Sequence, residues 1–148
     1  MPNPSDATFM PPRDTLEAPN GQTLSLCPTA VMGIINVTPD SFSDGGRYTT
    51  PEQASARAAT LRAAGAAIVD IGGESTRPGA TPVSTDEELA RVMPVIERIR
   101  HDQPDLMLSL DTSNPVVMQA GLDVGVAMIN DVRGLEAPGA LEVIAATG

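Results

Sequence analysis

Lysine and tryptophan are absent from this 148-residue sequence, and cysteine, tyrosine and phenylalanine are almost absent. Without lysine, the chain's own residues cannot form a Schiff base or a lysine-based phosphate cradle. One Tyr and two Phe leave almost no aromatic surface on which nucleic acid bases can stack. All nine basic residues are arginines, against nineteen acidic residues, and the net charge of -10 repels phosphate backbones. Nucleic acid is therefore not expected as a partner.

Long apolar runs are missing as well. No stretch reaches the roughly 18 to 20 apolar residues that a membrane helix needs, and the N-terminus lacks a basic region followed by an apolar core. The single cysteine, Cys27, has no second Cys and no nearby His at metal-ligand spacing, so we expect it to be a small buried hydrophobe in a reducing compartment. The chain is therefore expected to be cytoplasmic, without membrane contact.

What the sequence does contain is an alternation of short apolar runs and amphipathic segments from Ala30 onward, which predicts βα units. Residues 1–29 are expected to form an N-terminal arm, aperiodic to about Asn20, with a short extended segment at 23–26. Residues 30–148 are expected to form one domain. Its predicted strands are 31–37, 67–71, 106–110 and 127–131. Three of its helices are predicted to begin after the caps Thr50, Ser84 and Asn114, and a fourth at about Pro138. Capping boxes are predicted at Thr50/Gln53 and Ser84/Glu87.

Two α/β architectures with parallel strands fit this pattern: a doubly wound open sheet and a (βα)8 TIM barrel. Polar residues at or just beyond each strand end favour the barrel, which builds its sites there: Asn36, Glu74, Asp111, Asn130 and Asp131. Since a whole barrel takes about 250 residues, we expect the first four βα units of a barrel, truncated after the fourth helix. Exposed edges on its first and last strands imply either a fragment of a longer protein or a half-barrel that associates.

Three of the polar residues suggest specific chemistry. Asn36 offers an amide oxygen, a neutral hard ligand that suits Mg²⁺ when substrate phosphates and water complete the coordination. Asp111 ends an apolar strand and is not needed as a helix cap, because Asn114 fills that role. With Asn130, it could bind the hydrogen-bonding edge of a heterocycle, or each side chain could instead fix a neighbouring loop.

The loop 72–80, GGESTRPGA, brings hydroxyl and backbone donors to Arg77 and favours phosphate or carboxylate binding over a solvated arginine. The loop 36–46, NVTPDSFSDGG, contains two carboxylates, Asp40 and Asp44, but a tight surface turn has the same composition. His101 is near the end of the second predicted helix, where we expect contact with the helix dipole or solvent rather than a catalytic role.

Four segments, MGIINVTPDSFSDGG, DIGGESTRPGA, LSLDTSNP and MINDVRG, occur in this order from Met32 on. Together they resemble the dihydropteroate synthase family across residues 31–148. The resemblance implies a (βα)8 barrel that joins (7,8-dihydropterin-6-yl)methyl diphosphate to 4-aminobenzoate, giving 7,8-dihydropteroate and pyrophosphate, with Mg²⁺ as cofactor. Sulfonamides compete with the aminobenzoate in this family. The resemblance also implies a full-length homodimer whose interface lies outside this chain.

By motif position, the resemblance also assigns roles to individual residues. Asn36 would ligand the Mg²⁺ that carries the pyrophosphate, Asp111 and Asn130 would hold the pterin, and Thr76 would contact the pterin diphosphate. Phe42 and Asp44 would lie on a first mobile loop and Arg77 and Pro78 on a second, with Asp44 and Arg77 acting in catalysis. The family's further Asp, its Lys and Ser, and its anion-binding Arg come from later strands, so turnover by these 148 residues alone is not expected.

Two other interpretations remain at this stage. Pterin-binding methyltransferases, which pass a methyl group from a tetrahydrofolate to a corrinoid, also hold the pterin with Asp and Asn at strand ends. They release no pyrophosphate and have no use for the Asn36 and Arg77 arrangement. Alternatively, the chain is an inactive truncated fragment.

Overall fold

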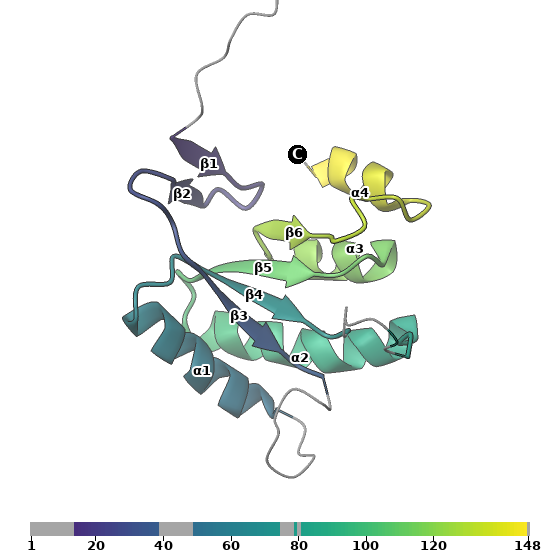
Figure 1. The fold of residues 1–148 in the computed structure, drawn as a ribbon, viewed down its shortest axis with the longest axis horizontal. Helices are drawn as coiled ribbons and strands as arrows, with labels where there is room; N and C mark the ends of the chain where they lie inside the picture. Colours follow the sequence, from purple (N-terminus) through teal and green to yellow (C-terminus); the bar gives the residue numbers. More distant parts are fainter. Residues whose placement is uncertain (1–13, 39–48, 75–78, 80, 148) are drawn as a thin grey trace, which may run out of the picture.

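The computed structural model describes residues 14–38, 49–74, 79 and 81–147. A short hairpin precedes four alternating strands and helices (Figure 1). The elements in chain order are β1 (Thr15–Glu17), β2 (Thr23–Ser25), β3 (Met32–Asn36), α1 (Pro51–Ala63), β4 (Ile68–Gly72), α2 (Thr85–Asp102), β5 (Met107–Asp111), α3 (Pro115–Asp123), β6 (Met128–Asn130) and α4 (Ala140–Thr147).

The four later strands form one parallel sheet in the order β3-β4-β5-β6, which is also their order in the chain. A doubly wound sheet reverses its strand order at a switch point. No reversal occurs in this sheet, and each new βα unit is added on the same side of the one before it, as in a barrel wall. The outer strands, β3 and β6, are its two edges within the described part of the chain.

The two faces of the sheet differ in what covers them. On β3, Gly33 and Ile35 are buried while Ile34 is 60% exposed. Ile35 is aligned with Ile71 and Leu110, and this row belongs to the main core, which also contains the apolar side of α2. Figure 1 shows α1 and α2 side by side along this face. The opposite face, which carries Ile34, corresponds to the interior of a barrel.

The helix starts follow the predicted capping chemistry with one difference. Thr50 and Gln53 form the complete capping box of α1, and Asn114 caps α3 by accepting from the Val116 amide at 3.0 Å. At α2, Ser84 accepts from the Glu87 amide, but the Glu87 carboxylate pairs with Arg91 instead of returning to the cap. The predicted box is therefore only half formed there. Among the described helices, none is long and apolar enough to cross a membrane.

The N-terminal hairpin corrects the expectation of an aperiodic segment up to Asn20. Residues 15–17 form β1, which pairs antiparallel with β2. Leu24 of β2 packs with Ile68 and Met107 in a second apolar cluster, at the N-terminal ends of β4 and β5. The hairpin turn is fastened there by Asn20, whose amide donates to the Gly125 carbonyl at 3.0 Å. The hairpin therefore covers the base of the interior face and leaves the C-terminal strand ends uncovered.

Cys27 is exposed, which contradicts the expectation of a buried side chain. It belongs to the connection between the hairpin and β3, where Leu26 and Val31 are also exposed. The connection reaches an apolar cluster only at Ala30, three residues later, so the Cys27 side chain stays outside the described core. The thiol therefore contributes nothing to the core.

Candidate functional site

The register of the sheet brings the predicted strand-end residues into one row. Asn36 is aligned with Gly72, Gly72 with Asp111, and Asp111 with Asn130. All four are on the interior face, because they follow Ile34 and its row by two residues on each strand. The sequence prediction that polar groups from separate strands meet at the carboxyl ends is confirmed for these positions.

Gly72 separates the two oxygen-bearing side chains of its neighbours. A Cβ added at Gly72 would lie 3.5 Å from Asn36 Oδ1 and 3.5 Å from Asp111 Oδ2. Both oxygens therefore border the space above Gly72, which a side chain there would fill. Amide and carboxylate oxygens are hard donors of the kind that Mg²⁺ prefers. In the described part of the chain, no group of three or more His, Cys, Asp or Glu residues could hold a metal ion.

Asp111 is a carboxylate in need of donors. It is partly buried, and within the described residues no hydrogen bond reaches its side chain. Burial, with the neighbouring charges of Asp70, Asp131 and Glu74, raises the pKa of Asp111 to about 6. As predicted, it is not the cap of α3. An ionised Asp111 is therefore prepared to accept hydrogen bonds from a ligand that carries N-H groups.

Asn130 has a partner that the sequence analysis missed. Its Nδ2 donates to Asp70 Oδ2 on β4 at 3.0 Å. Asp70 is only 3% exposed and faces the interior one row below Gly72. A charged residue in the middle of the apolar run 67–71 was the available signal, because a carboxylate is buried only where it has a partner or a function.

Asp131, the other strand-end carboxylate, has a different environment. It accepts from Ser113 Oγ at 2.5 Å and from the amides of Arg133 and Leu135 at 2.9 and 2.8 Å. Burial opposes ionisation, but these hydrogen bonds lower the pKa of Asp131 overall. Its acceptor sites are used to shape the loop after β6, so we place Asp131 in the scaffold.

Two residues of α2 support the strand ends from the helix side, and the sequence analysis missed both. Arg91 Nη1 donates to the Gly73 carbonyl at 2.8 Å and Nη2 pairs with Glu87. Glu88 is 2% exposed; burial raises its pKa, against a hydrogen bond with Thr112. The signal for Glu88 was its place on the buried side of α2, four residues before Val92.

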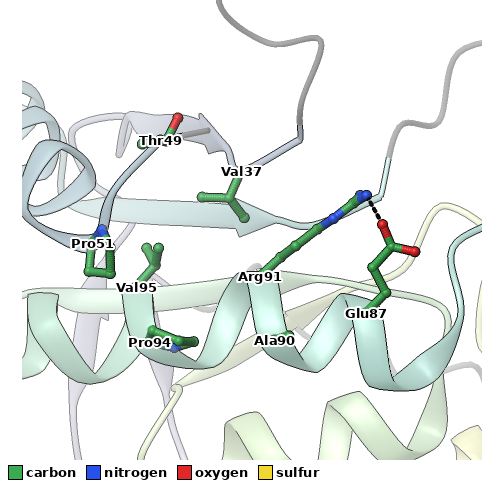
Figure 2. Close-up of a pocket in the computed structure, with 8 residues that line it drawn as sticks. All are labelled: Val37, Thr49, Pro51, Glu87, Ala90, Arg91, Pro94 and Val95. Carbon is green, nitrogen blue, oxygen red and sulfur yellow. Dashed lines mark hydrogen bonds and ion pairs between the residues drawn. The ribbon is translucent and has the colours of Figure 1, made fainter. Parts of the chain in front are cut away.

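Two cavities lie near the strand ends. One, of about 360 Å³, is between the start of α1 and α2 and is lined by Val37, Pro51, Arg91 and Val95 (Figure 2). Figure 2 shows the Arg91 guanidinium turned toward Glu87 at its rim. This cavity is on the helix side of the sheet, away from Asp111. The other, of about 380 Å³, is among the N-terminal ends of α2, α3 and α4 and is lined by polar residues that include Glu74, Glu88, Ser113 and Arg133.

Five predicted site residues are outside the described residues: Phe42, Asp44, Thr76, Arg77 and Pro78. Their roles stay predictions. His101 is at the end of α2, with its ring Nδ1 3.0 Å from Asp102 Oδ1 and its side chain 84% exposed. It lies at the opposite end of the sheet from Asp111, so it takes no part in the site.

The sequential parallel sheet, its covering helices and the polar strand ends are the features of a (βα)8 barrel wall. The family model for pterin binding enzymes matches residues 32–148, and the chain belongs to that family. It is 52% identical over 128 residues to dihydropteroate synthase of Escherichia coli (strain K12), covering 86% of this chain and 45% of the relative. The predicted resemblance is confirmed.

Solved structures give the same result. The Xanthomonas albilineans dihydropteroate synthase with 4-aminobenzoic acid superposes with a TM-score of 0.82 at 53% identity, covering 90% of this chain and 49% of that one. The Yersinia pestis enzyme in a sulfonamide drug complex gives 0.82 at 51% identity, with 90% and 48% covered. The chain thus has the first four βα units of a (βα)8 barrel and spans about half the length of these relatives.

Proposed function

We propose that this chain supplies the pterin diphosphate side of a dihydropteroate synthase active site. The enzyme would join (7,8-dihydropterin-6-yl)methyl diphosphate to 4-aminobenzoate, forming 7,8-dihydropteroate and pyrophosphate. The observation that carries the proposal is the strand-end row, in which Asn36 and Asp111 border the space above Gly72 and Asn130 is aligned with Asp111 on the next strand. The similarity to dihydropteroate synthases supports the choice of substrate.

The pterin would be recognised through its donor edge. A pterin presents a ring N-H beside an exocyclic amine, and both groups donate hydrogen bonds. Asp111 provides carboxylate oxygens to which no donor among the described residues is bonded, and Asn130 provides an amide oxygen from the next strand. Charge-assisted hydrogen bonds to Asp111 would offset the cost of its burial.

Asn36 is the residue of this chain that would hold Mg²⁺. Its amide oxygen borders the space above Gly72 on the side away from Asn130, which leaves the diphosphate to supply further oxygens. When bound, Mg²⁺ would stabilise the negative charge of the departing pyrophosphate. Asn36 thus orients the diphosphate while Asp111 holds the ring, so the bond to be broken lies between two fixed points.

The remaining roles come from motif position. We assign Thr76 to the pterin diphosphate, Asp44 to the pterin-methyl cation left when the C-O bond to the diphosphate breaks, and Arg77 to catalysis beside it. Phe42 and Pro78 belong to the same two loops. The amine of 4-aminobenzoate then attacks the cation and loses a proton. Because this chain has no lysine, the family's Lys would have to come from outside these 148 residues.

Isothermal titration with the pterin diphosphate tests the proposal. We expect saturable binding that needs Mg²⁺ and that Asn36→Ala weakens by about tenfold or more, the cost of one lost charge-assisted contact. Asn20→Ala is the matched control, because Asn20 belongs to the hairpin turn at the other end of the sheet. Binding without any need for Mg²⁺, or a preference for methyltetrahydrofolate, would contradict the proposal and favour the methyltransferase interpretation.

A further inference from the structure

Asp70 is a carboxylate on the interior face of β4, and stability does not explain its presence. It is 3% exposed and is aligned with Ser109 of β5. In the described part of the chain, Asp70 Oδ1 and Ser109 Oγ are both buried without hydrogen-bond partners. A buried carboxylate with an unpaired oxygen destabilises the fold that contains it. Among the described residues, its side chain has one hydrogen bond, with Asn130, and a function of Asp70 is expected to depend on that bond.

That bond determines which way the Asn130 amide points. Asp70 Oδ2 is 3.0 Å from Asn130 Nδ2. The Asn130 nitrogen donates and the Asp70 oxygen accepts, so the nitrogen is the amide atom turned toward Asp70. The amide oxygen is then directed away from Asp70, and no donor among the described residues is bonded to it. The bond spans from β4 to β6 across β5. It links the strand-end row, which contains Asn130, to the neighbouring row on the same face, which contains Asp70.

We infer that Asp70 is a positioning residue: by holding Asn130 Nδ2, it presents the Asn130 oxygen beside the Asp111 carboxylate as an edge that only accepts hydrogen bonds. Such an edge selects heterocycles with adjacent donors, as in a 2-amino-4-oxo ring, and rejects those with a carbonyl at the 2-position. An amide free to rotate would accept either group. The inference rests on the proposed function, because it concerns the same pterin site.

The test compares two ligands that differ at one group. The probes are 6-hydroxymethylpterin, with a 2-amino donor, and 6-hydroxymethyllumazine, with a 2-oxo acceptor. The wild-type chain should prefer the pterin by about tenfold or more, as expected when a buried polar group is left facing the wrong partner. In Asp70→Ala the Asn130 amide can rotate, and the ratio of the two affinities should fall several-fold, to about what the Asp111 carboxylate alone provides.

Asp102→Ala is the matched control. Asp102 is also a hydrogen-bonded carboxylate, but it accepts from Ser55 Oγ and Arg98 Nε at 2.7 Å at the C-terminal end of α2, away from the strand-end row. A general loss of rigidity would weaken both ligands together and leave their ratio unchanged. An Asp70→Ala ratio equal to the wild-type ratio, or the same fall in Asp102→Ala, overturns the inference.

A second measurement does not depend on binding. In the NMR spectrum of the ligand-free chain, the Asn130 side-chain amide should exchange slowly with solvent, and Asp70→Ala should abolish this protection. Equal exchange in the two proteins overturns the inference. If neither ligand binds the wild-type chain while the protection is present, the proposed function is wrong and the orientation of Asn130 by Asp70 stands.

Discussion

Asp111 and Asp131 are twenty residues apart, and their pKa values shift in opposite directions. Asp131 receives hydrogen bonds from Ser113 and from two backbone amides, and its pKa falls. Asp111 receives none from the described residues, and burial raises its pKa to about 6. The same chemical group is thus used once as scaffold and once as a ligand-binding acceptor, and the supply of donors makes the difference.

The raised pKa of Asp111 makes stability depend on pH. Because its pKa rises from 3.8 to about 6 on folding, its contribution is favourable at low pH and is lost as pH increases through about 6. The full shift corresponds to about 3 kcal/mol, which solvent screening of a half-exposed group reduces to about 1 kcal/mol. Asp111→Asn should therefore gain about 1 kcal/mol of unfolding free energy over wild type between about pH 4.5 and 7.5.

Urea unfolding at the two pH values measures this gain. Asp105→Asn is the control, because Asp105 is exposed just before β5, at the opposite end of that strand. Its difference from wild type should not change with pH in the same interval. An Asp111→Asn difference that is equally flat would show that Asp111 is already supplied with donors in the free protein.

At the scale of elements, substitutions at two glycines should distinguish an effect on ligand binding from an effect on stability. A Cβ at Gly72 would meet Asn36 and Asp111 oxygens at 3.5 Å, an ordinary contact, whereas a Cβ at Gly121 of α3 would come 2.5 Å from Leu110 Cδ2. Gly72→Ala should therefore leave stability within about 0.5 kcal/mol of wild type and reduce pterin diphosphate affinity by filling the space above the row. Gly121→Ala should instead cost about 1 to 3 kcal/mol by overpacking.

Urea unfolding and titration calorimetry on both variants check this pair. The structure predicts a crossed pattern, in which Gly72→Ala loses binding with normal stability and Gly121→Ala loses stability with normal binding at temperatures where it is folded. Normal pterin diphosphate binding by Gly72→Ala would mean that the ligand does not occupy the space between Asn36 and Asp111.

The four strands of the sheet and the N-caps Thr50, Ser84 and Asn114 were predictable because their signals are local. Each predicted sheet strand agrees with the observed one within a residue at either end, since continuous apolar runs mark buried parallel strands. Strand β1 was missed because all three of its residues are exposed and it has no apolar pattern. Ser84 caps α2 as predicted. The Glu87 side chain forms an ion pair with Arg91 instead of the predicted hydrogen bond to the Ser84 backbone, and a capping-box pattern does not reveal such a competitor.

The site was predictable in part. The row of Asn36, Asp111 and Asn130 follows from the rule that parallel strands end at one edge. The Asp70–Asn130 bond was not predictable, because it needs the register of three strands. Glu88 was hidden in a run of acidic residues at the start of α2, where charges usually face solvent.

At the scale of the whole molecule, the N-terminal end of the sheet is packed with apolar side chains and the C-terminal end has the polar groups. The hairpin seals the N-terminal end of the interior face with Leu24 and neighbouring apolar side chains. The C-terminal end has the polar row, and supporting contacts from α2 reach it from behind. Barrel enzymes divide stability and activity between their two ends in the same way. The central claim is therefore that ligand binding is confined to the C-terminal strand ends.

A ¹⁵N–¹H NMR titration of the 148-residue chain with 6-hydroxymethylpterin tests this claim most directly, because it reports every backbone amide at once. We expect the largest shifts at Gly72, Asp111, Thr112 and Asn130, and none at Leu24, His101 or Asp105 at the other end. Shifts centred on the hairpin end, on the cavity between α1 and α2, or nowhere would contradict a pterin site at the strand ends.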